Sequence, residues 1–564
     1  MSVETFDVVV VGAGWSGLIA AKTYLDFEPE AKLLIIDNHA TIGGTWAKER
    51  LYPSLFAQSK LGLFEYSFYP MRNEGITKDG YISCKTIHTY LNDFAEDFNL
   101  INRTRLLTHV ANVERTEQGG WKLNLVDKPA VETAKLIWAS GQSSDPVMPK
   151  YPTSNFNAPI IHSADTGKHL GAIDKIQSAT VVGAAKSAFD TVFLLLNAGK
   201  KVHWIIRDDG SGPLAMMPPT IFGIFNSVDI ISTRFSGLFG ASIMNTKGIG
   251  YQFFHKTRLG RTISKGWWKA VHYISTYSCG YSKSPDADRL RPLGNGNGIF
   301  WANSGLGTPS VPNYWKVFHA GDCTVHRTQI DSLVDNQVVL KNGDKFDTEL
   351  IIMATGFVRS AQAFPDDLKP LLGLAPDPRL EEHWTKLDQE ARNKVDELLP
   401  VLSNPPRDLL QAFDRAQVSK EQKLSYGPAR HYRRMISPYL AAQGDRSLFF
   451  AGLMHNIYTP MTVEVQALWG VAYMLGLHDV PSLDEMEKEA ALWNAWTGKR
   501  YRGIGKKHSY AIFDFQSYID TLLEDLGVRT HRMSNPLAEM FLPMRPRYYR
   551  GIIEEFRQVM EKRR

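Results

Sequence analysis

The feature that most constrains this chain is a glycine pattern directly after its first apolar run. Residues 6–11 form a short, mostly apolar segment of the kind that makes a strand buried on both faces. Gly12, Gly14 and Gly17 follow as Gly-x-Gly-x-x-Gly and lead into an expected helix. The first glycine permits a tight turn, the second lets the backbone approach a pyrophosphate, and the third lets the helix pack on the strand. Because the start of a helix attracts phosphate, the pattern predicts a dinucleotide site.

The next apolar run ends in a carboxylate at the spacing that such a site requires. Asp37 follows Leu-Leu-Ile-Ile and stands twenty residues after Gly17, where it would bind the ribose hydroxyls. Two adjacent glycines then precede Thr-Trp, and they suggest backbone packed closely against a ligand. We therefore expect Gly44 and Trp46, together with Val110 from a later strand, to contact the same cofactor.

A second fingerprint lies beyond a proline-rich linker. Gly183 begins Gly-x-Ala-x-x-Ala, with Lys186 and Ser187 in the turn, and the next strand ends in Arg207. An arginine there suits the 2′-phosphate of NADP, whereas an acid suits an unmodified ribose. The two fingerprints start 171 residues apart, and together they predict a chain that holds FAD and NADPH.

Length and composition limit the remaining classes of protein. The 564 residues require two or three domains, and a net charge of +5 is too small and too dispersed to indicate nucleic-acid binding. The three cysteines are far apart, so the sequence predicts neither a disulfide framework nor a metal site. With the first strand beginning near residue 6 and no long uninterrupted apolar run, we expect a cytoplasmic protein without a signal peptide or membrane span.

These patterns predict an α/β fold with two Rossmann-like dinucleotide-binding domains, of which the FAD domain is discontinuous and the NADPH domain is inserted into it. We expect the first part of the FAD domain at 1–155 and the NADPH domain at 156–354. The second part of the FAD domain, with a helical C-terminal region, is expected at 355–564. An apolar insertion is expected at about 210–310, and the NADPH-domain sheet is expected to resume at 317–320.

Two further regions carry predictions about ligands. Residues 213–280 are expected to roof a substrate pocket; the alternative is peripheral membrane contact through this segment or through the basic C-terminus. The helix expected from Pro460 has Thr462 and Gln466 near its start, where free N–H groups would face a flavin carbonyl. Capping of the helix explains the same two residues equally well.

The motifs together resemble the flavin-containing monooxygenase superfamily, which includes N- and S-oxygenases and Baeyer–Villiger monooxygenases. The segment 300–307 and the long insertion resemble its fungal secondary-metabolism branch in particular. The resemblance implies that NADPH reduces FAD, that the reduced flavin captures O₂ as a C4a-(hydro)peroxide, and that one oxygen atom passes to a small organic substrate. The motifs that carry it are Gly12-x-Gly-x-x-Gly17, Gly43-Gly-Thr-Trp46, Gly183-x-x-Lys-Ser-Ala188, Trp204-Ile-Ile-Arg207, Ala354-Thr-Gly-Phe357 and Pro460-x-Thr-x-Glu-x-Gln466.

The resemblance also implies two catalytic candidates. Thr355 belongs to the Ala-Thr-Gly-Phe motif. Gln58 stands eight residues before a Tyr-Ser pair, where the superfamily places an active-site Asn or Asp. An amide can hydrogen-bond a substrate but cannot act as an acid or base near neutral pH.

The type of oxygenation is the least determined prediction. The Baeyer–Villiger motif is degraded, since Ala158 replaces its glycine and Thr166 stands at its last position, although His162 is kept. Residues 304–313 contain no arginine or lysine, and a missing cation favours a neutral, electrophilic oxidant. We therefore expect hydroxylation, epoxidation or heteroatom oxygenation, unless Arg289 or Arg291 swings in.

Three alternatives stay open at different strengths. The first is a Baeyer–Villiger monooxygenase that makes an ester or lactone. A flavin disulfide reductase shares the double Rossmann plan but needs a pair of redox cysteines that this sequence lacks. A non-catalytic flavin-binding or membrane-peripheral protein is the third.

Overall fold

The first sheet is built from the N-terminal segment and one strand from far downstream. A computed structural model describes residues 3–221, 223–358, 361–415, 429–505 and 509–563, so parts of the expected 355–564 segment lie outside it. The strand order is β5-β2-β1-β8-β7-β6, with β24 beside β8. The strands are β1 (Glu4–Val11), β2 (Leu33–Ile36), β5 (Thr104–Arg105), β6 (Val110–Arg115), β7 (Trp121–Leu125), β8 (Lys128–Trp138) and β24 (Leu448–Phe450).

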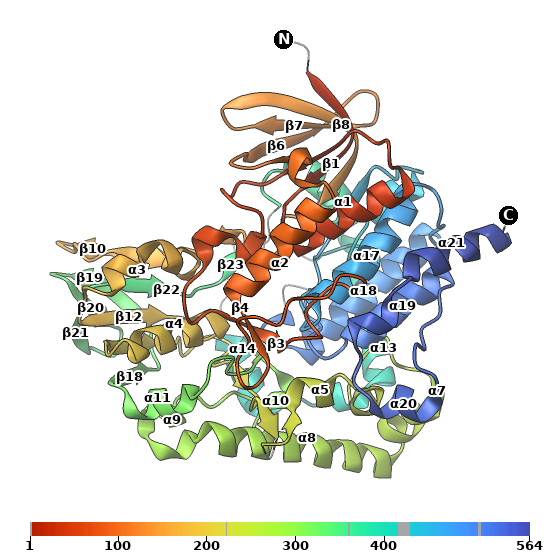
Figure 1. The fold of residues 1–564 in the computed structure, drawn as a ribbon. Helices are drawn as coiled ribbons and strands as arrows, with labels where there is room; N and C mark the ends of the chain where they lie inside the picture. The colour runs from red at the N-terminus through yellow and green to blue at the C-terminus, as the bar shows by residue number, and fades with distance from the viewer. Residues whose placement is uncertain (1–2, 222, 359–360, 416–428, 506–508, 564) are drawn as a thin grey trace.

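This sheet is parallel where it borders the first glycine turn. β1 pairs in parallel with β2 and β8, and β24 pairs in parallel with the last residues of β8. β6 and β7 form an antiparallel meander on the first half of β8, and Figure 1 shows them projecting at the N-terminal end of the molecule. The carboxyl ends of the parallel strands therefore meet beside the glycine turn.

The second sheet lies between β8 and β24 in the chain. Its order is β11-β22-β12-β13-β18, and every pairing is parallel. A separate sheet, β10-β19-β20-β21, stands beside it. The predicted fold class is thus confirmed, because one Rossmann-like sheet is inserted into the chain of the other. The strands are β10 (Thr153–Ser154), β11 (Ile160–His162), β12 (Ser178–Val182), β13 (Lys201–Ile205), β18 (Cys323–His326), β19 (Ile330–Val334), β20 (Gln337–Leu340), β21 (Lys345–Asp347) and β22 (Ile351–Met353).

One prediction about this sheet is wrong. Residues 317–320 were expected to be a strand, but they end the helix α11 (Tyr314–Ala320), and the strand β18 begins three residues later. A short apolar run does not separate helix from strand. The buried residues Tyr314 and Phe318 are four apart, so they share one helical face, and Tyr314 stacks on Phe193 of α4 (Lys186–Asn197) at 5.8 Å.

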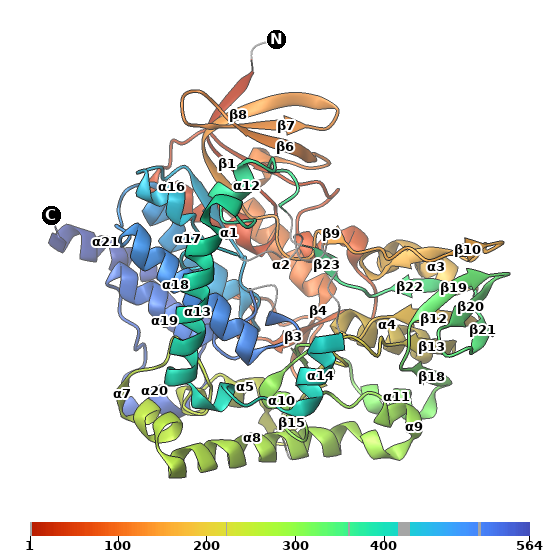
Figure 2. The same cartoon turned by 180° about the vertical axis from the view of Figure 1, so that it is seen from behind.

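The central helix of the molecule is α17 (Thr459–Met474), which starts one residue before the expected Pro460. All residues from Pro460 to Met474 are buried, as expected of a helix that is mostly apolar on every side. It packs between α1 (Trp15–Phe27) and α19 (Phe515–Leu526), and Figures 1 and 2 show the three helices side by side.

The insertion is mainly helical. Its longest element, α8 (Arg258–Cys279), runs along the edge of the molecule farthest from the N-terminus in both views (Figures 1 and 2). The inner side of α8 buries Trp268, whose indole N–H donates to the carbonyl of Phe239 and whose ring meets Phe300 and Phe513. The other helices are α5 (Ser227–Ile231), α6 (Arg234–Gly237), α7 (Gly248–Tyr251), α9 (Pro285–Asp288) and α10 (Gly298–Trp301).

The C-terminal half covers the first sheet and α17 with helices. They include α13 (Glu381–Leu398), α18 (Leu483–Arg500) and α21 (Ile552–Arg563), whereas α20 (Pro536–Phe541) packs against α6 of the insertion. Among the described residues, no helix combines the length and apolar character that a membrane crossing requires.

Candidate active site

The first glycine turn forces the backbone into contacts that only glycine allows. Gly12 has φ of +115°, and a Cβ there would lie 2.8 Å from the carbonyl carbon of Ala139. A Cβ on Gly17 would lie 2.9 Å from the carbonyl carbon of Gly12. Both glycines are therefore required by the packing of strand, turn and helix. Gly14 differs, because a Cβ there would make only an ordinary contact, 3.5 Å from the Cα of Gly44.

The second glycine turn has the same backbone hydrogen bond and the same close backbone approach as the first. The N–H of Gly12 donates to the carbonyl of Ile36, and the N–H of Gly183 donates to the carbonyl of Ile205. Gly183 has φ of +139°, and its Cβ would lie 2.8 Å from the carbonyl carbon of Ala354, which matches Ala139 in the first turn. Two turns of one geometry therefore stand at the ends of two parallel sheets.

A helix begins directly after each glycine turn. Among the residues that the structure describes, no side chain caps the start of either helix. The N-caps of α1 and α4 are Gly14 and Ala185, and neither first turn contains an acidic residue. Trp15 and Ser16 of α1, and Lys186 and Ser187 of α4, all line one cavity. Uncapped N–H groups and the positive end of the helix dipole suit phosphate, so this cavity is built to receive two phosphate-bearing ligands.

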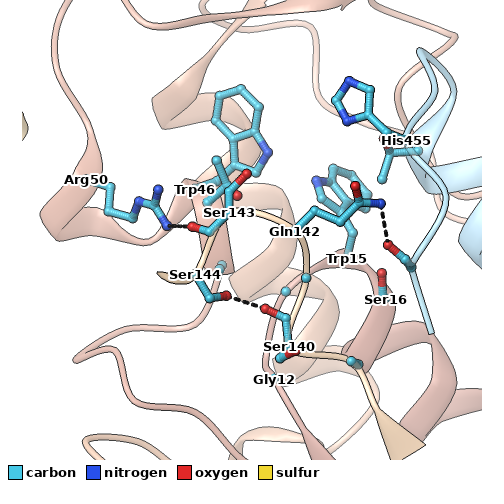
Figure 3. Close-up of a pocket in the computed structure, with 18 of the residues that line it drawn as sticks. Gly12, Trp15, Ser16, Trp46, Arg50, Ser140, Gln142, Ser143, Ser144 and His455 are labelled. Carbon is cyan, nitrogen blue, oxygen red and sulfur yellow. Dashed lines mark hydrogen bonds between the residues drawn. The ribbon is translucent and has the colours of Figure 1, made fainter. Parts of the chain in front are cut away.

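The cavity has a volume of about 640 Å³ and extends from the first glycine turn to α4. Figure 3 shows the loop after β8 crossing its floor, where Gln142 donates to the carbonyl of Gly452 and Ser144 donates to that of Ser140. The predicted residues that line it are Gly12, Gly14, Asp37, Gly44, Trp46, Gln58, Val110, Lys186 and Ser187.

Asp37 is held at the cavity wall by the glycine turn itself. One carboxylate oxygen accepts from the N–H of Ala13 at 2.7 Å, and the other accepts from the N–H of His39 at 2.8 Å. Burial alone would raise the pKa of Asp37, but these hydrogen bonds and the His39 ring lower it. Asp37 is thus an anion, which is the form that accepts hydrogen bonds from ribose hydroxyls.

Gln58 lies where the cavity passes under the insertion. It belongs to β3 (Phe56–Lys60), and its side-chain oxygen accepts from the N–H of Thr308 at 3.1 Å. Leu306 of β17 (Leu306–Gly307) lines the same part of the cavity. Leu306, near the end of the insertion, therefore covers the cavity next to Gln58, whereas none of the described residues of 213–280, the segment expected to form the roof, lines the cavity.

Lys186 is not free to move at the start of α4. Its ammonium contacts Asp190 and donates to the hydroxyl of Ser310 at 3.1 Å. Burial raises the pKa of Asp190, and Lys186 opposes that shift. The lysine thus presents a fixed positive charge beside the second turn.

Arg207 lies outside the cavity lining. It stands two residues after Ile205, the last residue of β13, whereas Asp37 stands one residue after Ile36. Ile205 and Ile36 occupy equivalent positions, so Arg207 lies one residue later than Asp37. Its side chain is 62% exposed, and its nearest carboxylate, Asp209, is 3.8 Å away. The guanidinium is therefore available to a ligand that reaches past the edge of the second sheet.

Five other predicted residues do not line the cavity: Gly17 and Gly183 pack against the backbone of the protein itself, and Thr355, Thr462 and Gln466 have partners elsewhere. The hydroxyl of Thr355 donates to the carbonyl of Val147 at 2.5 Å, in the connection between the two sheets. Thr462 is buried and bonds Asn456, and Gln466 is buried between the N–H of Gly452 and the hydroxyl of Tyr518. These contacts keep Thr355, Thr462 and Gln466 out of the space where a ligand fits, so the three are positioning residues.

The histidine of the degraded Baeyer–Villiger motif sits at the junction of the sheets. The Nδ1 of His162 accepts from the N–H of Ala164, so its Nε2 carries the proton that points to the carbonyl of Gly356, 3.1 Å away. Burial lowers the pKa of His162, so the ring is neutral. Arg289 and Arg291 are bound to Asp286 and Asp288 on the surface and do not line the cavity.

Sequence reasoning missed several residues of the cavity. Arg50 donates to the carbonyl of Ser143 at 3.1 Å (Figure 3). The centre of its guanidinium group lies 5.8 Å from the ring centre of Phe357. Burial lowers its pKa, although nearby carboxylates oppose the shift. His455 also lines the cavity, stacked 5.2 Å from Tyr510. In the sequence, Arg50 could have been found from its position four residues after Trp46. His455 could not, because it belongs to a loop that is distant along the chain.

Fold and cavity define a flavoprotein with two dinucleotide-binding units around one site. Residues 9–226 match the family described as pyridine nucleotide-disulphide oxidoreductase. The match does not extend to disulfide chemistry, because Cys84, Cys279 and Cys323 are all free and none of them lines the cavity.

The chain belongs to the family of fungal FAD-dependent monooxygenases. It is 47% identical over 560 residues to the FAD-dependent monooxygenase DEP4 of Alternaria brassicicola, covering 99% of this chain and 95% of that one. It is 45% identical over 564 residues to DEP4 of Fusarium langsethiae, covering 100% and 96%. A solved steroid monooxygenase bound to NADP has a similar fold, with a TM-score of 0.57 at 15% identity and coverage of 99% and 97%.

Proposed function

We propose that this chain is an NADPH-dependent monooxygenase that transfers one atom of O₂ to a small organic substrate in fungal secondary metabolism. The observation that carries the proposal is the pair of uncapped helix starts, on α1 and α4, that line one cavity. Two phosphate-bearing cofactors around a single cavity are what a flavin and a nicotinamide need in order to exchange a hydride.

The residues at the first turn fit FAD. Gly12, Gly14 and Gly44 line the cavity with backbone against which a pyrophosphate would lie, and Asp37 supplies an anion for the ribose. Trp15 also lines the cavity, and its buried indole N–H has no partner among the described residues. A bound flavin supplies the redox chemistry with O₂ that no side chain provides; the chain orients it and excludes water.

The residues at the second turn favour NADPH over NADH. Lys186 holds a fixed charge beside the start of α4, and Arg207 is exposed at the end of β13. A guanidinium binds a phosphate through two parallel hydrogen bonds, which an unphosphorylated ribose cannot reproduce. We assign Arg207 to the 2′-phosphate and Lys186 to the remaining phosphates or the nicotinamide ribose.

The surroundings of Gln58 support electrophilic oxygenation. Its amide oxygen is occupied by the N–H of Thr308, and residues 304–313 bring no cation to this part of the cavity. Arg289 and Arg291 are held by surface carboxylates. The two cations that line the cavity, Lys186 and Arg50, are engaged by Asp190 and by the carbonyl of Ser143, so an anionic oxidant is disfavoured and the neutral form reacts. We therefore propose hydroxylation, epoxidation or heteroatom oxygenation.

Baeyer–Villiger oxygenation is the second candidate, and Arg50 is the observation that favours it. Its guanidinium lines the cavity, although it is engaged with Ser143. If it turned toward the substrate, it would stabilise an anionic oxidant and favour attack on a carbonyl.

Product analysis under ¹⁸O₂ with NADPH tests both candidates. The proposal expects a hydroxylated, epoxidised or heteroatom-oxidised product that carries one labelled oxygen. A labelled ester or lactone would establish the Baeyer–Villiger reaction instead. NADPH consumption with no labelled product from any substrate offered, despite full flavin, would contradict monooxygenation.

A further inference from the structure

The insertion carries an unusually one-sided charge. Residues 230–285 contain eight lysines and arginines and no aspartate or glutamate. Arg234 is bound to Asp520 and Glu539 in the interior. The other seven form no ion pair with any carboxylate in the part of the chain that the structure describes. They are Lys247, Lys256, Arg258, Arg261, Lys265, Lys269 and Lys283.

Large apolar side chains are exposed among these cations. Ile249 on α7 is 89% exposed, Leu259 on α8 is 63% exposed, and Tyr277 near the end of α8 is 81% exposed. Phe253 on η5 (Gln252–Lys256), and Ile263 and Tyr273 on α8, are exposed as well. We call the exposed residues of α7, η5 and α8 the α8 face. It lies along the outer edge of the molecule in both views (Figures 1 and 2).

A short helix from the C-terminal region extends this face. α20 exposes Leu537 and Phe541, and the ring of Phe541 lies 5.2 Å from that of Phe235. Phe235 in turn lies 6.0 Å from Trp267 of α8. The apolar side chains of α20 and the α8 face therefore stand at one corner of the molecule, where Figures 1 and 2 place α7 and α20 together.

We propose that the α8 face docks on the surface of an anionic lipid bilayer. Exposed aliphatic side chains, tyrosines and unpaired cations on one helix are the composition of a helix that lies in the headgroup region. A helix of 22 residues is about 33 Å long, so α8 offers the bilayer an extended line of contact. A protein partner or a second copy would need carboxylates to match the seven cations, whereas an anionic bilayer supplies negative charge over its whole area.

The inner side of the same helix reaches the roof of the cavity. Ser275 of α8 bonds the carbonyl of Met216 in β14 (Ala215–Met216), which pairs with β17, and Leu306 of β17 lines the cavity. One helix thus separates the proposed bilayer surface from the roof of the cavity. Such a helix would let an apolar substrate pass from the bilayer to the cavity. That step rests on the proposed function, whereas docking itself does not.

Co-sedimentation with vesicles tests the docking. The purified flavin-containing protein is mixed with vesicles of phosphatidylcholine alone or with about 30 mol % phosphatidylserine, because each cation near an anionic surface strengthens binding about fivefold. We expect binding only to the anionic vesicles, and a loss of at least about tenfold in K265E/K269E. L259S/I263S should also weaken binding, since it removes the inserted side chains.

The matched control is K175E/K345E, which changes the same charge at two exposed lysines outside the α8 face. It should bind vesicles nearly as the unchanged protein does. Equal binding to both vesicle types, or an equal loss in the control, would overturn the proposal. So would a dimer by light scattering that L259S/I263S dissociates, or tighter binding to duplex DNA than to anionic vesicles. Flavin content is measured in each variant, and it separates these outcomes from failure of the proposed function.

Discussion

Replacing Gly12 with alanine tests the claim that the first turn is fixed by packing of the protein on itself. Gly12 has φ of +115°, and the new Cβ would lie 2.8 Å from the carbonyl carbon of Ala139. The backbone strain costs roughly 1–3 kcal/mol. Displacing Ala139, which pairs with the end of β1, adds about 1–3 kcal/mol as overpacking does elsewhere. Gly12→Ala should therefore destabilise the protein by roughly 2–6 kcal/mol.

Gly343→Ala is the matched control. Gly343 has φ of +92°, but nothing lies within 4 Å of the Cβ that it would gain, so only the strain term applies. Gly14→Val completes the series. Its Cβ meets the protein only at ordinary distance, while its methyl groups enter space that the flavin needs.

The assay is thermal unfolding of the apoproteins, together with the ratio of flavin to protein after gel filtration. We expect Gly12→Ala to lower the midpoint well below that of Gly343→Ala and to lose flavin. Gly14→Val should lose flavin while its apoprotein unfolds close to the unchanged apoprotein. Equal midpoints for Gly12→Ala and Gly343→Ala would show that packing on Ala139 does not fix the turn, and stoichiometric flavin in Gly14→Val would show that the flavin does not need this space.

Three further outcomes are expected. Arg207→Ala should reduce the preference for NADPH over NADH about tenfold, which is the low end of the range for a charge-assisted pair, because the Arg207 side chain is exposed. An unchanged ratio of the two reduction efficiencies would exclude Arg207 as the residue that selects NADPH. Burial raises the pKa of Glu464, which accepts from Ser67, to about 7, so the folded state binds a proton that the unfolded state has lost, and the free energy of unfolding should fall as pH rises from about 4.5 to 7. Glu464→Gln should flatten that pH dependence in thermal unfolding scans, and the same pH dependence in the variant would contradict it. Gln58→Ala should lower the product formed per NADPH oxidised without changing flavin content, and unchanged coupling would place Gln58 outside the reaction.

The parts of the site that the sequence predicted are those set by local geometry. Gly12, Gly17 and Asp37 occupy fixed offsets from one strand, so their spacing carried the information. Gly183 was predicted for the same reason, and the structure shows that its turn copies the first.

What the sequence could not predict depends on distant contacts. His455 enters the cavity from a loop more than 400 residues after the first turn, and Arg50 is aimed by the carbonyl of Ser143. Thr462 and Gln466 have the expected positions on a buried helix, but Asn456, Tyr518 and the backbone N–H of Gly452 occupy their polar atoms. The helix α8 was missed because glycines interrupt its apolar pattern, and packing of Trp268 under the insertion stabilises it.

The central claim is that one chain holds FAD and NADPH around the same cavity. Anaerobic mixing of the flavin-containing protein with NADPH tests it most directly, with the flavin absorbance near 450 nm as the readout. We expect NADPH to bleach the flavin completely and an equal concentration of NADH to bleach it much more slowly. A flavin that dithionite bleaches but NADPH leaves unchanged would contradict the central claim.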